Sequence, residues 1–251
     1  MYVIISPAKN QQTTLACPIT TTTKYRFQTE VQELLGLLRQ YSEQELGSLM
    51  SISPNIAKLN FQRYEDFNVG TQFPAGFLFH GDVYRGLDVA SWQVQDCEYA
   101  QIHLGILSGL YGWLKFLDMI SPYRLEMKTR LANAKGNTLY AFWADKITLA
   151  IKQHMQNYQL EQVVNLASQE YFKVINPKAL GLPIIDIAFK EVGPKGLRVI
   201  AVKAKKARGV MAAYIIKNKM TSITDLQKFQ QLGYKFSAEH SSAKELVFVS
   251  A

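Results

Sequence analysis

The sequence is poor in the residues that build metal sites and disulfide frameworks. It contains two cysteines and four histidines in 251 residues. Cys17 and Cys97 lie far apart in the chain and do not indicate a disulfide scaffold. No pair of these side chains has the C-x-x-C, H-x-x-x-H or E-x-x-H spacing of a local transition-metal site. We therefore predict no metal site, and we expect the protein to bind Fe(II) no more tightly than an ordinary carboxylate surface does.

Long apolar runs and the common nucleotide-binding loops are also absent. No run approaches the ~18–20 apolar residues that a membrane span needs. The first residues, Met1–Pro7, lack the basic start and small-residue cleavage site of a signal peptide. The sequence has no G-x-x-x-x-G-K-S/T loop, no G-x-G-x-x-G fingerprint, and no G-x-S-x-G frame around Ser108. These absences predict a cytoplasmic protein that needs no membrane and no cofactor of the usual nucleotide kinds.

The remaining composition is that of a globular domain. Hydrophobic residues make up 48% of the chain, and Tyr and Phe supply thirteen residues each for a core. No linker rich in Gly, Ser or Pro, no low-complexity tract and no repeat divides the sequence. We predict one compact domain over residues 1–251.

Apolar patterns place strands and helices along this domain in no regular alternation. Strands are predicted over 2–5, 104–107, 123–127, 163–167, 184–189, 197–202, 234–238 and 246–249. Helices are predicted from Thr29, with Thr29 and Gln32 as a capping box, and over 96–103, 139–155, 204–219 and 224–230. Simple βαβ repetition is excluded by this order. The fold class is therefore mixed α/β (α+β), with helices around a mixed sheet that contains antiparallel pairs.

Residues 42–64 have the outline of a helix-hairpin-helix element. Ser42 with Glu45 predicts one helix start, and Ser53 with Pro54 predicts a second. A link of only three residues, 51–53, joins the two helices. Such a hairpin can present backbone amides to DNA phosphate. Because the link lacks the usual glycines, two ordinary packed helices are the alternative.

The segment 107–127 is the most irregular part of the chain, and it combines glycines with charged residues. Gly109 and Gly112 favour sharp turns, and Pro122 forces another turn. Buried charges are normally paired. We therefore predict that Arg124 forms a buried or cleft-floor ion pair with Asp118 or Glu126.

Several motifs together resemble one known family. LSGLYG (107–112), PYRLEM (122–127) and LYAFW (139–143) are similar to the YaaA family of bacterial peroxide-stress proteins, also called DUF328 or UPF0246. Further motifs of the family occur in the same order along this chain. They are ISPAK (5–9), GDVYRGL (81–87), NLAS-x-EY (165–171) and KKARG (205–209). One departure is Phe116, which stands where the family has Pro in L-x-P-L-D. The resemblance implies a role in protecting DNA from peroxide and in limiting free iron.

Positive charge is concentrated near the C-terminal third of the chain. Residues 192–224 contain eight Lys or Arg and no Asp or Glu, which matches the whole formal net charge of +8. A basic surface concentrates polyanions. Within this window, Lys203, Lys205, Lys206 and Arg208 lie near a predicted helix start, where cations are unfavourable without a nearby anion. Together with Gly209, which permits a close approach, they predict phosphate binding. A solvated face or an internal ionic network is the alternative.

Two main interpretations of function follow. The first is a DNA-binding stress protein with a basic cleft, which binds duplex or distorted, partly single-stranded DNA largely without sequence preference. Its candidate binding residues are Lys9, Tyr84, Tyr111, Arg124, Lys203, Lys205, Lys206 and Arg208. The alternative is an enzyme acting on a nucleotide or nucleic-acid component in the same cleft. Its candidate acid and base residues are Asp82, Asp118, Glu126 and Glu170. A protein partner in iron handling is a third interpretation, and the oligomeric state stays open.

Overall fold

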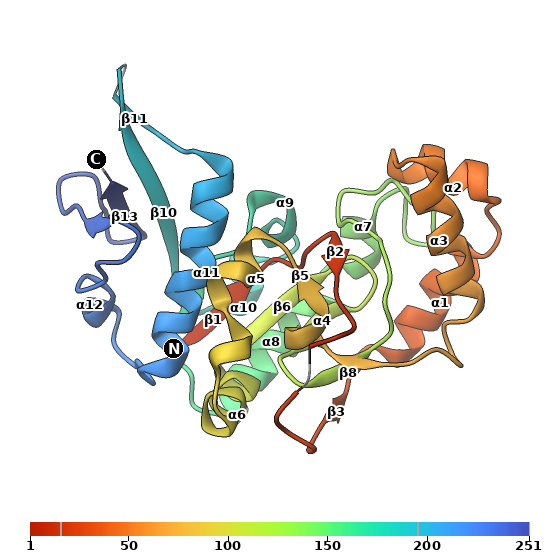
Figure 1. The fold of residues 1–251 in the computed structure, drawn as a ribbon, viewed down its shortest axis with the longest axis horizontal. Helices are drawn as coiled ribbons and strands as arrows, with labels where there is room; N and C mark the ends of the chain where they lie inside the picture. The colour runs from red at the N-terminus through yellow and green to blue at the C-terminus, as the bar shows by residue number, and fades with distance from the viewer. Residues whose placement is uncertain (16, 195, 251) are drawn as a thin grey trace.

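A mixed sheet runs through the centre of the molecule (Figure 1). The structure is a computed structural model and describes residues 1–15, 17–194 and 196–250. The main path of the sheet has the order β12-β13-β10-β9-β1-β6-β7, and β11 pairs with β10 outside this path. Its strands are β1 (Tyr2–Ile5), β6 (Leu104–Ser108), β7 (Gly112–Lys115), β9 (Val163–Asn165), β10 (Ile184–Gly193), β11 (Gly196–Arg198), β12 (Lys235–Phe236) and β13 (Glu245–Ser250).

The five central strands of this sheet are parallel, and the antiparallel pairs lie around them. β1 pairs in parallel with both β6 and β9, and β10 pairs in parallel with β9 and β13. β7, β11 and β12 each pair antiparallel with one neighbour. Every residue of β1 and β6 is buried. Parallel strands covered on both faces are apolar throughout, which explains why the runs at 2–5 and 104–108 take central positions.

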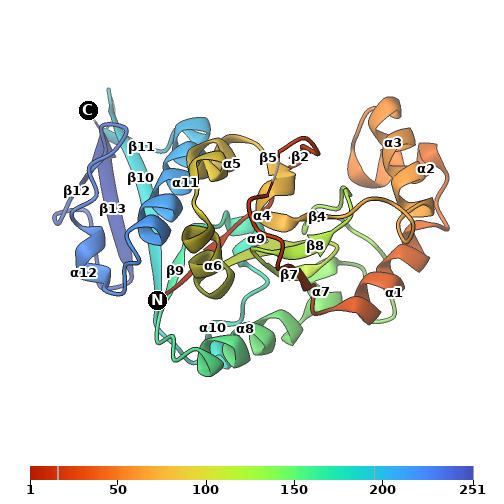
Figure 2. The ribbon, with the colours of Figure 1, turned by 60° about the horizontal axis from the view of Figure 1, so that its bottom comes forward.

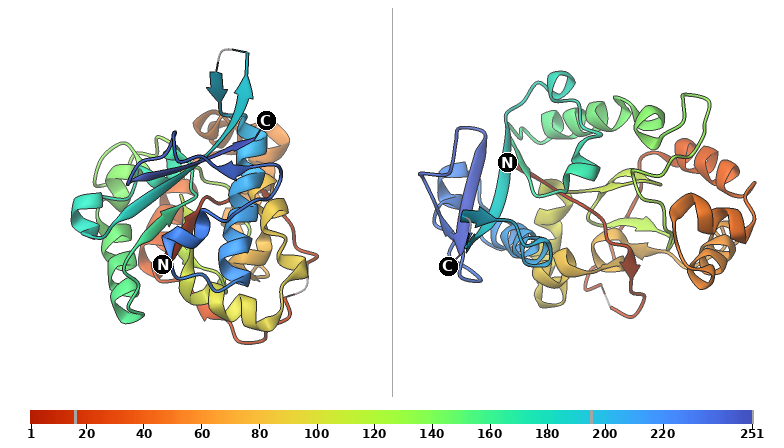
Figure 3. Two further views of the ribbon diagram at one scale, coloured as in Figure 1. Left: turned by 90° about the vertical axis from the view of Figure 1, so that its left-hand side faces the viewer. Right: turned by 90° about the horizontal axis from the view of Figure 1, so that it is seen from above.

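Helices cover both faces of the sheet (Figure 3). On one face lie α6 (Val94–His103) and α11 (Ala201–Lys217), with α5 (Asp82–Leu87) packed along α11. On the other lie α8 (Lys146–Asn157) and α10 (Pro177–Leu180). The remaining helices near the sheet are α4 (Ala75–Leu78), α7 (Leu139–Trp143), α9 (Gln169–Phe172), α12 (Ile223–Leu226) and the short 3-10 helix Val89–Ser91. In the part of the chain that the structure describes, no helix has the length and apolar character to cross a membrane.

Three helices gather at the end of the molecule opposite the C-terminal strands (Figures 1 and 2). They are α1 (Gln28–Leu38), α2 (Glu43–Met50) and α3 (Pro54–Glu65). Two small sheets connect this end to the centre. One pairs β2 (Asn10–Gln11) with β5 (Phe79–His80), and the other contains β3 (Thr23–Lys24), β8 (Asp118–Ile120) and β4 (Phe73–Pro74). The predicted class, one compact domain with a mixed sheet surrounded by helices, is confirmed.

Several local predictions are confirmed and others are wrong. The start of α2 is confirmed, because the Glu45 amide donates to Ser42 Oγ and the Ser42 amide donates to Glu45 Oε2. The capping box at Thr29 is wrong, since α1 begins at Gln28 and its N-cap residue has no side-chain cap. The long helix over 139–155 is wrong, because Ala144 has a φ of 38° and separates α7 from α8. Residues 123–127 are irregular and form no strand.

The hairpin predicted between 184 and 202 is present but shorter. β10 and β11 pair antiparallel, with Glu191 opposite Arg198. Residue 195 of the predicted turn lies outside the described residues. After β11 the chain enters α11 at Ala201, so the predicted second strand does not reach residue 202.

Candidate functional site

A cleft of about 260 Å³ opens where β1 and β9 end. We call it the β1–β9 cleft. Five segments that lie far apart in the sequence line it, and they contribute Ser6, Lys9, Asp82, Glu126, Glu170 and Arg208 among others. The motifs ISPAK, GDVYRGL, PYRLEM, NLAS-x-EY and KKARG each supply at least one lining residue. Segments that are separate in the sequence therefore meet at one place.

The topology of the sheet explains why a cleft forms here. The chain runs from β1 to β6 on one side of β1 and later returns to β9 on the other side. In open α/β sheets, ligands bind outside the carboxyl ends of the strands at such a reversal of strand order. Ser6 directly follows β1 and Leu166 directly follows β9, and both line the cleft.

Hydrogen bonds fix the two loops at this point. The Ser168 amide donates to Ser6 Oγ at 2.9 Å, and Ser6 Oγ donates to Ser168 Oγ at 3.3 Å. The Leu166 amide donates to the Ile4 carbonyl at 2.9 Å, which continues the strand pairing by one residue. The buried Tyr84 hydroxyl donates to the Ser6 carbonyl at 3.1 Å. Ser6 and Ser168 thus join the ends of β1 and β9 into one wall of the cleft.

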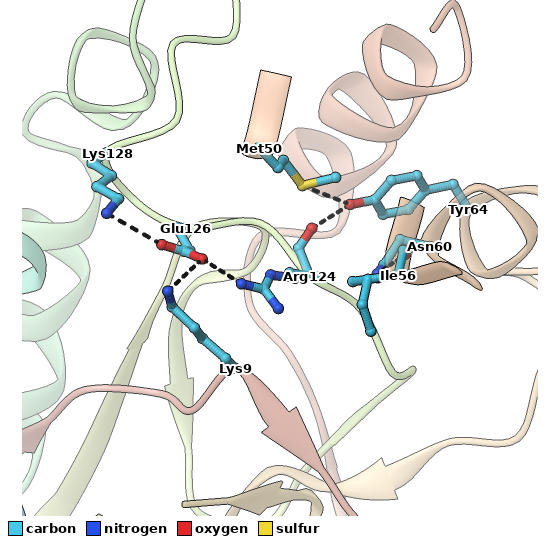
Figure 4. Close-up of polar contacts among 8 residues, drawn as sticks. All are labelled: Lys9, Met50, Ile56, Asn60, Tyr64, Arg124, Glu126 and Lys128. Carbon is cyan, nitrogen blue, oxygen red and sulfur yellow. Dashed lines mark hydrogen bonds and ion pairs between the residues drawn. The ribbon is translucent and has the colours of Figure 1, made fainter. Parts of the chain in front are cut away.

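Glu126 is the centre of a group of cations at the cleft (Figure 4). Its carboxylate lies 3.2 Å from Lys9 Nζ, 3.0 Å from Arg124 Nη2 and 3.6 Å from Lys128 Nζ. The side chain is 11% exposed. Burial by itself would raise the pKa of Glu126, but Lys9 and Arg124 outweigh burial and lower it. The predicted ion pair between Arg124 and Glu126 is confirmed.

Asp118 lies away from this cleft, in β8. Its carboxylate accepts hydrogen bonds from the Thr23 hydroxyl and from the Lys115 amide. The side chain is buried, and burial raises the pKa of Asp118 in spite of these two bonds. The structure brings the other three candidate carboxylates, Asp82, Glu126 and Glu170, to the cleft and leaves Asp118 as part of the β3–β8 contact.

The four cations of the KKARG region take different positions on α11. Lys205 and Arg208 line the cleft. Lys206 is exposed. Lys203 is not among the lining residues and forms an ion pair of 2.8 Å with Glu191 of β10. Within residues 1–15, 17–194 and 196–250, no ion pair involves Lys205, Lys206 or Arg208.

Gly209 does permit a close approach, but the group that approaches it is another helix. A Cβ at Gly209 would lie 1.8 Å from the Val83 carbonyl oxygen of α5. A Cβ at Gly86 would lie 2.2 Å from the Lys206 carbonyl oxygen of α11. The two glycines therefore let the backbones of α5 and α11 pack in contact, and this contact positions Lys205 and Arg208 at the cleft.

Two predicted stacking residues lie in the core. Tyr84 is 5% exposed, and its hydroxyl is bonded to Ser6. Tyr111 is fully buried; its ring packs against Tyr25 and its hydroxyl donates to the Ser121 carbonyl. Neither ring faces solvent, so a stacking role would require the core to open. The tyrosine that lines the cleft is Tyr171 of NLAS-x-EY.

His80 was not predicted as a site residue. It lines the cleft directly before the GDVYRGL motif. Its position after an apolar run and before Gly81 was the only local signal. The antiparallel pairing of β5 with β2 brings His80 opposite Asn10, and that long-range pairing could not be read from the residues.

The charges that line the cleft are mixed in sign. The cations are Lys9, Lys205 and Arg208, and the carboxylates are Asp82, Glu126 and Glu170. Asp82 is paired with Arg85 of the same helix. Glu170 Oε1 and Arg208 Nε are buried and have no hydrogen-bond partner among the described residues. The arrangement can bind a ligand that accepts hydrogen bonds at one point and donates them at another.

No metal centre is apparent in the described part of the chain. No group of three or more His, Cys, Asp or Glu side chains there has an arrangement that could hold a metal ion. Both cysteines are free thiols. Burial, with a smaller contribution from Cys17, raises the pKa of Cys97 to about 12. The expectation of weak Fe(II) binding stays a prediction.

The helix-hairpin-helix outline at 42–64 corresponds to two packed helices, α2 and α3. Ser51 in the link has a left-handed backbone with φ of 52°. The amides of Ser51 and Ile52 donate back to carbonyls of α2. A groove of about 460 Å³ between the helices has Glu43 as the charged residue of its lining. We call it the α2–α3 groove.

Comparison with known proteins agrees with the motifs over the whole chain. The family described as "Peroxide stress protein YaaA" matches residues 1–240. A UPF0246 protein of Saccharophagus degradans is 46% identical over 252 residues, covering 99% of this chain and 98% of the relative. A UPF0246 protein of Idiomarina loihiensis is 44% identical over 255 residues, covering 100% and 99%. One of Legionella pneumophila strain Lens is 41% identical over 254 residues, covering 99% of both chains. The chain belongs to the YaaA family of peroxide stress proteins.

Proposed function

We propose that this protein acts in the bacterial cytoplasm by binding DNA during peroxide stress, through phosphate contacts made by α11 at the β1–β9 cleft. The observation that carries the proposal is the state of the α11 cations. Lys205 and Arg208 line the cleft and Lys206 is exposed beside them, with no ion pair to a described residue. Lys203, by contrast, is neutralised by Glu191.

The position of these cations on the helix differs from that of Lys203. α11 begins at Ala201, so Lys203 lies in its first turn, whereas Lys205 and Lys206 lie in its second turn and Arg208 follows within the same half of the helix. Because the helix dipole acts mainly within the first turn, the need of these three cations for an anion comes from their lack of an ion pair and not from the dipole. DNA phosphate is such an anion, and contacts to it carry no sequence information. Binding should therefore depend strongly on salt and weakly on sequence.

The test is a fluorescence-anisotropy titration of a labelled duplex at several salt concentrations. We expect the double variant Lys205→Ala/Lys206→Ala to bind more weakly and to reduce the slope of log K against log salt by roughly two, since each lost phosphate contact removes about 0.9 from the slope. The matched control is Lys217→Ala/Lys219→Ala, which removes the same charge from two exposed positions, one at the last residue of α11 and one just beyond it. Equal affinities and slopes for both variants would show that only net charge matters and would contradict the proposal.

A second candidate function, an enzyme acting on a nucleotide, is favoured by one observation. Glu170 lines the cleft with a carboxylate oxygen that is buried and unpartnered among the described residues. Such a group is a candidate general base. Turnover is tested by incubating the protein with nucleotides and oligonucleotides and separating the products by chromatography. Product that forms with wild type and disappears with Glu170→Gln would support this candidate, and absence of product from every substrate would count against it.

A further inference from the structure

We propose that the β1–β9 cleft binds one nucleotide unit, with its phosphate at Lys205 and Arg208 and an N–H group of its base at Glu170. The proposal deepens the DNA binding proposed above and rests on it. It assigns the interior of the cleft to a base that has left the duplex. The cations beside the cleft then contact the neighbouring backbone.

The first argument is the pair of unsatisfied groups. Arg208 Nε and Glu170 Oε1 are buried and have no hydrogen-bond partner among the described residues. Both residues line the same cleft. Buried polar groups are nearly always partnered, so one unsatisfied donor and one unsatisfied acceptor at a single site need an explanation. A ligand that presents an anionic acceptor and a neutral N–H donor would satisfy both once the two side chains rotate and bring these atoms to the surface of the cleft.

The second argument is the charge that remains when internal pairs are removed. Asp82 is neutralised by Arg85, and Glu126 is paired with three cations, Lys9, Arg124 and Lys128, which leaves two positive charges in excess there. The charged residues of the lining that form no ion pair with a described residue are Lys205, Arg208 and Glu170. Arg208 is also near Asp186, which lies in an adjoining cleft on its other side.

These three groups differ in the sign of their charge. A nucleotide within a strand carries one phosphate charge and a base edge with N–H donors. The phosphate matches Lys205 and Arg208, and the N–H donors match the carboxylate of Glu170. A nucleotide therefore satisfies both kinds of group, whereas an inorganic polyanion would leave Glu170 without a donor.

The third argument is size. The cleft measures about 260 Å³. Ligand sites usually measure about 300–1,000 Å³, so this one accepts at most one small ligand. A stacked duplex cannot enter, whereas a nucleotide rotated out of the stack can. Tyr171 lines the cleft and burial raises its pKa, so its ring is a neutral wall against which a base can stack.

The experiment compares three labelled duplexes of one sequence by anisotropy at a fixed salt concentration. One is perfectly paired, one has a single unpaired guanosine, and one has an unpaired abasic residue at the same position. For wild type we expect the duplex with the unpaired guanosine to bind about tenfold more tightly than the duplex with the abasic residue. Hydrogen bonds to a base edge typically give a preference of this size. Glu170→Gln should reduce this preference to about twofold. Glu98→Gln, an equal charge change at an exposed position of α6, should leave the preference unchanged.

The outcomes separate this proposal from the one on which it rests. If wild type binds DNA but does not distinguish guanosine from the abasic residue, the nucleotide proposal is overturned and DNA binding stands. If no duplex binds in a salt-dependent way, the proposed function itself fails. Free guanosine monophosphate, added as a competitor, distinguishes the source of the nucleotide: displacement of only the guanosine probe identifies a free nucleotide, and no displacement identifies a nucleotide within a strand. If Glu170→Gln does not fold, the preference of wild type for the guanosine duplex over the abasic duplex still tests the nucleotide proposal.

Discussion

The β1–β9 cleft and the α2–α3 groove are both places where this protein was expected to meet DNA phosphate, and they differ in what lines them. The groove is the larger, at about 460 Å³ against about 260 Å³. Among the described residues, its lining includes Glu43 and no Lys or Arg, and the amides of Ser51 and Ile52 in the link donate to carbonyls of α2. The cleft is lined by six charged side chains, two of which have buried atoms without partners among the described residues.

The comparison teaches that polar groups without partners indicate a binding site more strongly than the outline of a motif does. Two helices joined by a short link need only pack against each other. The backbone amides that could bind a phosphate then donate their hydrogen bonds to carbonyls of the helices instead. A cleft at a reversal of strand order, in contrast, collects side chains from many loops and leaves some of them unpaired.

The largest expected effect concerns the contact that holds α11 at the cleft. Gly209→Ala should lower the free energy of unfolding by about 3 kcal/mol, because its Cβ would lie 1.8 Å from a backbone oxygen of α5 and the helices must separate. Gly47→Ala in the α2–α3 pair is the matched variant. There the new Cβ would lie 3.6 Å from Ala57 Cβ, an ordinary contact. We expect a gain of about 0.5–1 kcal/mol at that site from helix propensity.

Urea unfolding followed by circular dichroism measures both glycine variants. The expected result is a lower midpoint for the first and an equal or higher midpoint for the second, with unchanged slopes. Equal midpoints for the two variants would show that α5 and α11 are not packed in contact and would remove the structural reason for the position of Arg208.

The next effect concerns the charge of Glu126. Glu126→Gln leaves Lys9, Arg124 and Lys128 close together without an anion. We expect a loss of about 2–3 kcal/mol near neutral pH, below the ~3–5 kcal/mol of a fully buried pair, because both lysines are largely exposed. An exposed pair serves as the control: Asp225→Asn, which breaks the contact to Lys228, should cost less than about 0.5 kcal/mol.

The pH dependence of the Glu126 effect has a definite sign. The folded pKa of Glu126 is lowered from an ordinary value of 4.5. A carboxyl with a lowered pKa stabilises the protein above its unfolded pKa, and this contribution is lost as the pH falls through the folded pKa. The difference in urea midpoint between wild type and Glu126→Gln should therefore be full above about pH 5 and should shrink below about pH 4.5. A difference that is constant across this range would mean that the carboxylate charge is not what stabilises the cleft.

The sequence was sufficient to predict those strands and helices that are marked by the pattern of residues within the element itself. The buried runs at 2–5 and 104–108 and the basic helix α11 follow from apolar pattern and length. The break at Ala144 had only a weak local signal, since alanine rarely adopts a positive φ and only the following Asp145, the N-cap residue of α8, is of a type that favours helix starts. The parallel pairing of β1 with β6 and β9 was hidden as well, because it joins residues more than a hundred positions apart.

Of the site, the charged members were easier to predict than the aromatic ones. Lys9, Glu126 and Arg208 lie in motifs, and a charged side chain of that kind is rarely buried without a reason. Tyr84 and Tyr111 lie in equally clear motifs but are core residues with bonded hydroxyls. A tyrosine has both an apolar ring and a polar tip, so its pattern in a sequence does not tell a core position from a stacking position.

The smallest expected effect tests whether the α2–α3 pair contacts DNA phosphate. Lys58 is an exposed cation of α3, in the second half of the predicted hairpin element. If the hairpin held DNA phosphate, Lys58→Ala would remove about 0.9 from the slope of log K against log salt, as any lost phosphate contact does. We expect instead a slope and an affinity within experimental error of wild type, since the groove beside it is lined by Glu43 and offers no basic partner. The measurement is the same anisotropy titration that tests Lys205→Ala/Lys206→Ala, with the same duplex and salts. A reduced slope for Lys58→Ala would contradict this expectation and would mean that the α2–α3 pair contacts DNA phosphate.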